Sequence, residues 1–354
     1  MLQTAIHAID PSSAEIRVAA QARIDSLVKP PGSLGRLEEI AAQVAAISGT
    51  ITPAPRKKCT IVMAADHGIV EEGIACAPQE VTAIQSLNML KNITGICALS
   101  AANGADLRVV NIGIKPKISH PGLVERNIRP GTANFAKAPA MERQEAEQAL
   151  LVGIEMVKTL VAEGYNLIGT GEMGIGNTSC SSAIYMAFTG ADADEAVGKG
   201  GGITDEALIR KKKVISAALK LHRPDPNDPM DVLAKVGGLD VAGMAGCFLG
   251  AAHCRVPVVI DGFISAAAAL VAYRLNPLVR DYMIPSHLSA EPSYIHIMRE
   301  LDLEPMLYLN MRLGEGTGCP LAFGIIDAAL GMLNNMATFD EAMISRDHLV
   351  DLRP

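Results

Sequence analysis

The stretch CTIVMAAD, Cys59 to Asp66, decides the fold, because it is an uninterrupted apolar and β-branched run that ends at an acidic residue. Such a run predicts a strand buried on both faces, which is typical of a parallel sheet covered by helices on both sides. Similar runs follow along the chain, separated by longer helix-like segments, and this alternation predicts an α/β fold. The other predicted strands are 107–114, 166–171, 256–262, 306–313 and, as a shorter possibility, 282–286.

Helix-like segments lie between these strands. Residues 80–105 and 143–164 carry apolar side chains at a spacing of three to four and end in glycine. This spacing indicates one buried stripe, and glycine is a common helix stop. Helices on both faces of the sheet are therefore expected.

The two ends of the chain lack strand-like runs. Near the N-terminus the pattern predicts helices at about 12–28 and 36–48 on either side of the loop KPPGSLGR. We therefore predict two domains, a small helical one built from both chain ends and a large α/β one. Their boundaries are 1–50 with 330–354 for the small domain and 51–329 for the large domain.

Composition narrows the function. The chain has 354 residues, 49% hydrophobic and 19% charged, with a formal net charge of -7. Binding to a phosphate backbone needs a basic face, so nucleic acid is an improbable partner. The start MLQTAIHAIDPSS has no basic region followed by an apolar block, which predicts a cytoplasmic protein. The longest uncharged run, Met173 to Ala191, begins with glycine and hydroxyl residues, so no membrane span is expected.

Cysteine and histidine spacing gives no sign of a metal. The seven cysteines, at 59, 76, 97, 180, 247, 254 and 319, are scattered and form no C-x-x-C pair. No H-x-x-x-H or H-E-x-x-H spacing occurs among the eight histidines. We predict no metal site, no other cofactor and no disulfide framework.

Each polar or glycine-rich loop of interest follows a predicted strand. These loops are AADHG, GTGEMGIGNTS, DGF, PSHLSAE and GEGTG. The carboxyl ends of parallel strands meet at one edge of a sheet, where ligands of such folds bind. The loops therefore predict a single ligand cleft.

The loop GTGEMG, 169–174, matches the G-x-G-x-x-G pattern of dinucleotide-binding enzymes, so an NAD-dependent oxidoreductase is one alternative. The match is weak, because the following helix is predicted to begin only at Asn177. The residues Gly174, Gly176, Asn177 and Thr178 instead suit one phosphate, held by bare N–H groups at a helix N-terminus. A second glycine run, which includes Gly201 and Gly202, precedes another helix and is expected to close on the same anion.

Glu315 is the least ordinary residue of the last loop. It stands between two glycines in RLGEGTGCPLAF, 312–323, where a turn would use Asn or Asp and a helix cap Ser, Thr or Asp. A lone carboxylate at the edge of a ligand cleft is a candidate general base. The alternative is a solvated turn residue without a chemical role.

Several of these motifs together carry a family resemblance. The chain resembles the nicotinate-nucleotide:5,6-dimethylbenzimidazole phosphoribosyltransferases, the CobT family of cobalamin synthesis, over nearly its whole length. The motifs KPPGSLGRLE and RLGEGTG are the most specific. The others are AADHGIVEEGIACAPQEVTAIQ, GTGEMGIGNTS, KVGGLDVAGMAG, DGFIS and IPSHLSAE.

The resemblance implies a transferase. Nicotinate mononucleotide and 5,6-dimethylbenzimidazole would give α-ribazole 5′-phosphate and nicotinate, with inversion at the anomeric carbon and no metal. It also implies a Rossmann-like sheet in a large catalytic domain, a small domain from both chain ends, and a homodimer.

The resemblance further implies roles for individual residues. Glu315 would be the catalytic base, and Glu172 would order the ribose or the incoming base, unless it is a plain turn residue. The phosphate would lie against the two glycine loops with Lys211 beside it. The remaining substrate contacts implied are Met173, Pro78, Gln85, Met89 and Leu313 around the base, with Ser289 and Arg312 near nicotinate. For Met89 a place in the core is the better alternative.

Some positions depart from the family pattern. Thr317, Cys319 with Pro320, and Ala77 stand where relatives carry other small residues. These departures leave the identity of the base open among benzimidazoles, adenine and phenols. A relation to phenol-activating members would also allow a heterodimer with a paralogue, in which this chain is a partner subunit without catalytic activity.

Overall fold

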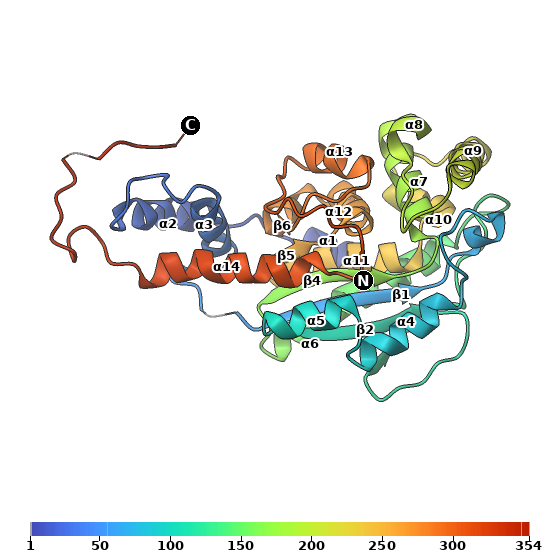
Figure 1. Cartoon of the computed structure of the whole chain (residues 1–354), viewed down its shortest axis with the longest axis horizontal. Helices are drawn as coiled ribbons and strands as arrows, with labels where there is room; N and C mark the ends of the chain where they lie inside the picture. The colour runs from blue at the N-terminus through green and yellow to red at the C-terminus, as the bar shows by residue number, and fades with distance from the viewer. Residues whose placement is uncertain (1, 55, 348, 354) are drawn as a thin grey trace.

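The architecture is a parallel α/β sheet, seen here in a computed structural model that describes residues 2–54, 56–347 and 349–353. Six strands of the described chain form one sheet in the order β3-β2-β1-β4-β5-β6, and every pairing is parallel (Figure 1). This is the order of the doubly wound dinucleotide-binding fold, so the predicted Rossmann-like sheet is confirmed. The strands are β1 (Lys58–Ala65), β2 (Asp106–Gly113), β3 (Leu123–Glu125), β4 (Leu167–Met173), β5 (Val258–Ile260) and β6 (Met283–Pro285).

The central strand β1 shows why the sheet has helices on both sides. Ile61 and Met63 point into a core shared with α6 and α11, whereas Val62 and Ala64 point into a second core with α4 and α5. All four side chains are fully buried. Alternating side chains that are apolar on both faces can only be buried between two layers of helices.

The helices largely follow the predicted pattern. The predictions at 12–28, 36–48 and 143–164 correspond to α2, α3 and α6, and α7 begins at the predicted Asn177. The helices are α1 (Leu2–His7), α2 (Ala14–Ser26), α3 (Arg36–Ser48), α4 (Val81–Leu90), α5 (Gly95–Ala102), α6 (Arg143–Ala162), α7 (Asn177–Thr189), α8 (Ala193–Ala196), α9 (Asp205–His222), α10 (Pro229–Val236), α11 (Leu239–His253), α12 (Phe263–Leu275), α13 (Ser293–Glu300) and α14 (Gly318–Asn335), with short 3-10 turns η1 (Gly68–Glu72) and η2 (Pro277–Tyr282).

Three details of the predicted elements are wrong. Residues 80–105 form two helices, because Asn92 adopts a left-handed conformation with φ of 59° between α4 and α5. The short strand β3 was not predicted, since it offers only a three-residue signal.

The third correction concerns residues 306–313, which form no strand. Leu307 makes a single parallel bridge to His287, and the N–H groups of Met306 and Leu307 both donate to the Ser286 carbonyl. Beyond it Tyr308 and Leu309 are exposed, and Asn310 turns the chain with φ of 54°. The apolar run therefore leaves the sheet edge instead of extending it.

An arm of helices projects from the sheet. In Figure 1, α2 and α3 lie beside the far end of the long helix α14, at the opposite end of the molecule from α7 and α9. Their apolar side chains form a hydrophobic cluster with Leu167, Val259 and Ile284 of the sheet. Helix α1 instead packs on α6 and α11. The proposed domain boundaries stay a prediction.

Membrane spans, cysteines and metal sites were considered for the described residues. None of their helices has the length and apolar character that a membrane span requires. All seven cysteines are free thiols. Within the same ranges, no three histidine, cysteine or acidic side chains come together in a way that could hold a metal ion.

Candidate active site

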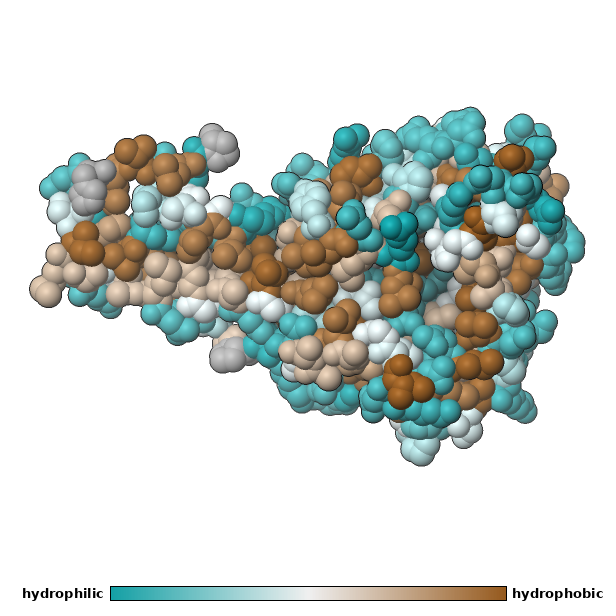
Figure 2. Space-filling view, viewed as in Figure 1, coloured by the Kyte–Doolittle hydropathy of each residue, from teal (hydrophilic) through white to brown (hydrophobic). Residues whose placement is uncertain are grey.

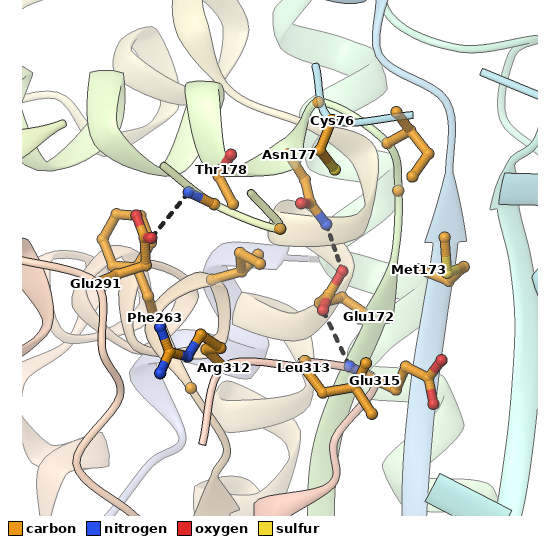
Figure 3. Close-up of a pocket in the computed structure, with 18 of the residues that line it drawn as sticks. Cys76, Glu172, Met173, Asn177, Thr178, Phe263, Glu291, Arg312, Leu313 and Glu315 are labelled. Carbon is orange, nitrogen blue, oxygen red and sulfur yellow. Dashed lines mark hydrogen bonds between the residues drawn. The ribbon is translucent and has the colours of Figure 1, made fainter. Parts of the chain in front are cut away.

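A cavity of about 370 Å³ lies at the carboxyl ends of the strands. Its walls come from the segments that follow β1, β4, β5 and β6, and from residues 312–315 ahead of α14 (Figure 3). The strand order of the sheet reverses between β1 and β4, and folds of this order bind ligands at that point. Four of the five predicted loops line this cavity, whereas AADHG at 64–68 contributes no residue to its lining.

One end of the cavity is built from the start of α7. Gly176 adopts the left-handed region with φ of 99° and turns the chain from β4 into the helix, so that Asn177 and Thr178 at the start of α7 lie in the cavity wall. A Cβ at Gly176 would lie 2.9 Å from a methyl group of Val70. Partly positive N–H groups at a helix N-terminus favour an anion.

Lys211 supplies a cation at the same end. Its side chain is 1% exposed, and its Nζ donates to Thr178 Oγ1 at 2.8 Å and to the Gly198 carbonyl at 3.2 Å. Burial lowers the pKa of Lys211, whereas the nearby Glu291 raises it. A buried ammonium held only by neutral oxygens is well suited to pair with an anionic ligand.

Glu291 faces Lys211 across the second glycine loop. Its Oε1 accepts a hydrogen bond from the Gly200 N–H at 2.9 Å, a contact drawn in Figure 3. Burial raises the pKa of Glu291, and the Lys211 charge opposes this shift. Once protonated, the carboxyl group can donate a hydrogen bond to an anion rather than repel it.

The other end of the cavity is acidic. Glu172 points to the middle of the cavity, where it accepts hydrogen bonds from the Asn177 side chain and, at 3.2 Å, from the Glu315 backbone N–H (Figure 3). Burial, followed by repulsion from Asp240, raises the pKa of Glu172 to about 7. This carboxyl group is poised to be either neutral or charged near neutral pH.

Glu315 lies beside Glu172 but directs its carboxylate toward α4 and α5. Its Oε1 accepts from Gln85 Nε2 at 2.6 Å and its Oε2 from the Ile96 N–H at 3.3 Å. The side chain is 5% exposed and lies in the cavity wall between Met173 and Leu313 (Figure 3). An acceptor beside an apolar slot can remove a proton from a flat heterocycle bound there.

Asp261 is the third buried acid of this end. Burial raises its pKa to about 7, against the hydrogen bonds from the N–H groups of Gly318, Gly316 and Gly262, while the charge of Glu315 adds to the increase. His287 lies 3.9 Å away, but burial lowers the pKa of its imidazole to about 4. His287 is therefore neutral, and the contact is not an ion pair.

A buried polar network adjoins Glu172 at the acidic end of the cavity. His67 Nε2 lies 3.2 Å from Asp240 Oδ1, and the Asn177 amide bridges Asp240 and Glu172. Burial alone would lower the pKa of His67, yet Asp240 and then Cys180 raise it well above the usual value. The imidazolium compensates the charge of Asp240, which allows a second acid to lie nearby.

Most of the predicted site residues line the cavity. Lining it are Gln85, Glu172, Met173, Gly174, Gly176, Asn177, Thr178, Gly201, Lys211, Ser289, Arg312, Leu313 and Glu315. Three others lie outside its lining. Pro78 is exposed on the segment before α4, Gly202 follows the loop that reaches the cavity, and Met89 is 1% exposed in the core around α4.

Several polar residues of the site were not assigned a role from the sequence. They are His67, Asp240, Asp261, His287 and Glu291. The available signal was their position, because each occurs inside a motif quoted above. Their roles depend on contacts between distant segments, which spacing along the chain does not reveal.

The GTGEMG motif has a different structural role from a dinucleotide loop. Gly169 and Gly171 lie inside β4, not in a turn. A Cβ on Gly169 would lie 2.7 Å from Cys319, and one on Gly171 would lie 2.6 Å from the Glu315 carbonyl oxygen. These glycines let the segment around Glu315 pack on the strand, so the motif does not support NAD binding.

Known proteins resemble this chain over most of its length. The phosphoribosyltransferase family model DBI_PRT matches residues 9–344. A nicotinate-nucleotide–dimethylbenzimidazole phosphoribosyltransferase of Clostridium tetani is 48% identical over 354 residues, which cover 100% of this chain and 98% of that protein. The chain belongs to this phosphoribosyltransferase family.

Other family members extend the match. The enzyme of the same name from Acetivibrio thermocellus is 52% identical over 326 residues, covering 92% of this chain and 93% of its own length. The crystal structure of CobT from Thermus thermophilus superposes with a TM-score of 0.90 at 42% identity, covering 94% of this chain and 99% of that one. The family resemblance inferred from the motifs is confirmed.

Proposed function

We propose that this chain transfers the phosphoribosyl group of nicotinate mononucleotide to 5,6-dimethylbenzimidazole or a related flat base, and releases nicotinate. The main support for the proposal is that one cavity has a cationic end at Lys211 and an acidic end at Glu315. The relatives named above support the choice of substrates.

Glu315 takes the proton in this reaction. One ring nitrogen of the base attacks C1′ of the ribose, and the bond from C1′ to the nicotinate nitrogen breaks. The other ring N–H becomes acidic as the new bond forms, and Glu315 accepts its proton. Gln85 donates to Oε1 of Glu315 and fixes the carboxylate on the α4 side of the cavity wall, which Met173 and Leu313 also line.

Glu172 stabilises positive charge. The pyridinium of the nucleotide is cationic, and positive charge spreads to the ribose as the glycosidic bond breaks. Glu172 lies in the cavity wall, and a carboxylate that is fixed before reaction favours that charge without reorganisation. Nicotinate leaves with a neutral ring nitrogen, so the step needs no general acid.

The phosphate is assigned to the opposite end. Backbone N–H groups at the start of α7, the glycine loop at 200–201 and the Lys211 ammonium surround that part of the cavity. Arg312 and Ser289 also line the cavity, and we assign them to the nicotinate carboxylate. The two substrates thus lie along one line from Lys211 to Glu315.

Product analysis tests this function. Purified protein is incubated with nicotinate mononucleotide and a panel of benzimidazoles, adenine and phenols, and the products are identified by mass. We expect a ribosylated benzimidazole phosphate and one equivalent of nicotinate. Absence of turnover with every base would contradict the proposal and favour a non-catalytic partner subunit. Tight binding of NADH in a parallel titration would favour an oxidoreductase.

We further propose that the chain forms a homodimer and works in the cytoplasm. Figure 2 shows apolar residues gathered over the arm at the end opposite α7 and α9. Met343, Ile344 and Val350 of the C-terminal segment are exposed there. Such a contiguous surface favours burial in a partner. Seven free thiols suit a reducing compartment. Light scattering on the purified protein tests the dimer.

A further inference from the structure

The backbone at Glu315 is held in an uncommon conformation. Its φ is 62°, and the flanking Gly314 and Gly316 have φ of 85° and 90°. Glycine adopts this region freely, whereas a residue with a Cβ is strained there. Such a conformation persists only where surrounding contacts impose it. The contacts that impose it on Glu315 therefore also determine where its carboxylate lies.

Asp261 makes two of these contacts. Its Oδ2 accepts a hydrogen bond from the Gly316 N–H at 3.1 Å and its Oδ1 one from the Gly318 N–H at 2.6 Å. The Asp261 backbone is itself fixed, since its N–H donates to Ser265 Oγ at 3.1 Å and its carbonyl accepts from Ser286 Oγ at 3.0 Å. The carboxylate thus joins the end of β5 to the segment that carries Glu315.

The start of α14 explains why a carboxylate is needed there. Thr317 stands at the cap position of this helix but makes no capping hydrogen bond, because its hydroxyl donates back to the Gly314 carbonyl at 2.8 Å. Asp261 instead caps the helix from another element. A negative charge beside the first N–H groups of a helix is stabilising.

The fit around the segment is close. A Cβ on Gly318 would lie 2.3 Å from His287 Nδ1 and 2.8 Å from Asp261 Oδ1. A Cβ on Gly316 would lie 3.0 Å from the Gly171 Cα. The segment is therefore fixed by Asp261 on one side and by β4 on the other, and little room is left for it to shift.

We propose that Asp261 is a positioning residue for Glu315. By holding the N–H groups on the C-terminal side of Glu315, it imposes the left-handed backbone that directs the Glu315 carboxylate to the base. Asp261 acts through Glu315, not by contributing to nucleotide affinity. The inference rests on the proposed role of Glu315 as general base.

A double-mutant cycle in single-turnover kinetics tests this relation. Asp261→Asn keeps the size of the side chain but replaces one acceptor oxygen with a donor NH₂. We expect the single-turnover rate to fall roughly 10- to 100-fold, as for a misplaced catalytic group, with nucleotide affinity nearly unchanged. In the Glu315→Gln background the same substitution should change the rate less than about threefold. Equal losses in both backgrounds would overturn the proposal.

Asp228→Asn is a matched control. Asp228 also caps a helix by accepting from two N–H groups, those of Met230 and Asp231, but it lies outside the cavity lining. We expect this variant to retain the wild-type rate. A comparable rate loss in this variant would mean that any lost helix cap impairs the enzyme, which would contradict a specific role for Asp261.

Hydrogen exchange separates this proposal from the proposed function. The amides of Gly316 and Gly318 should exchange at least about tenfold faster in Asp261→Asn than in the wild type, whereas amides of β1 should be unchanged. This measurement needs no turnover. Unchanged exchange at both glycines would refute the positioning contact even if the enzyme reaction is correct.

Discussion

The two ends of the cavity carry opposite charges, and the charged groups have different surroundings at each end. At the end that we assign to the phosphate, the buried ammonium of Lys211 lies beside the start of α7 and the glycine loop at 200–201. At the other end, three buried acids, Glu172, Asp261 and Glu315, lie together, and their hydrogen-bond donors among the described residues are all uncharged. If the proposed function is correct, phosphate binding depends on one buried charge and chemistry on several, so substitutions at the two ends should have different kinetic signatures.

The largest effect is expected at Glu315. Glu315→Gln keeps the shape but cannot accept a proton, so the single-turnover rate should fall about 10²–10⁴-fold while nucleotide affinity is nearly unchanged. Stability should fall by about 1–3 kcal/mol, because the hydrogen bond to the remaining oxygen persists but the new NH₂ group faces the other donor, Gln85 Nε2 or the Ile96 N–H. Glu80→Gln, on the exposed surface before α4, is the control with no expected effect. A Glu315→Gln enzyme that keeps more than about a tenth of the rate would exclude this residue as the base.

Lys211 should have the next largest effect, and on binding instead of rate. Lys211→Met keeps the length of the side chain and removes the charge, so the dissociation constant of the mononucleotide should rise about 10- to 100-fold, as expected for one lost charge-assisted hydrogen bond. Calorimetric titration measures it. Lys213→Met on the same helix is the control. If the affinity stayed within about twofold of wild type, the phosphate would have to bind elsewhere.

A steric substitution beside Glu315 should affect the acidic end of the cavity alone, without altering any charge. In Gly171→Ala, the new Cβ would lie 2.6 Å from the Glu315 carbonyl oxygen and 3.0 Å from Val62. We expect about 1–3 kcal/mol of destabilisation in urea unfolding, and a rate loss of roughly tenfold with intact phosphate binding. Gly331→Ala in α14 is the control, since nothing lies within 4 Å of its Cβ. Wild-type activity in Gly171→Ala would show that the segment adapts freely.

Glu172 should have the smallest effect on the reaction rate. Its main effect is expected on the pH dependence of stability. Its pKa is raised from 4.5 to about 7 in the folded protein, so the folded state favours the protonated form. Its contribution is therefore fully present below pH 4.5 and lost as pH rises through about 7, by about 3 kcal/mol.

Urea unfolding of Glu172→Gln and wild type between about pH 5 and 8 measures this contribution. The neutral amide cannot titrate, so the variant should gain stability relative to wild type as pH rises across this range. Its rate loss should be smaller than that of Glu315→Gln. A constant difference in stability at all pH values would mean that Glu172 does not titrate in this window.

The sequence was sufficient for features that depend on local patterns. The apolar runs around Val62 and Ile168 predicted their strands, and glycine with Asn177 predicted the start of α7. The sequence failed at 306–313, where an equally apolar run leaves the sheet because Asn310 turns the chain. It also missed the role of Asp261, since hydrogen bonds across more than fifty residues have no local signature.

The proposed function separates phosphate binding at Lys211 from proton transfer at Glu315. The most direct test compares nicotinate mononucleotide with nicotinate riboside, which lacks the phosphate, as substrates of wild type, Glu315→Gln and Lys211→Met. With kcat/KM as the readout, we predict that Glu315→Gln slows both substrates by the same factor. Lys211→Met should slow the mononucleotide and leave the much slower riboside reaction unchanged. If Lys211→Met slowed the riboside as strongly as the mononucleotide, Lys211 would not be the phosphate ligand, and the separation of binding from chemistry would be wrong.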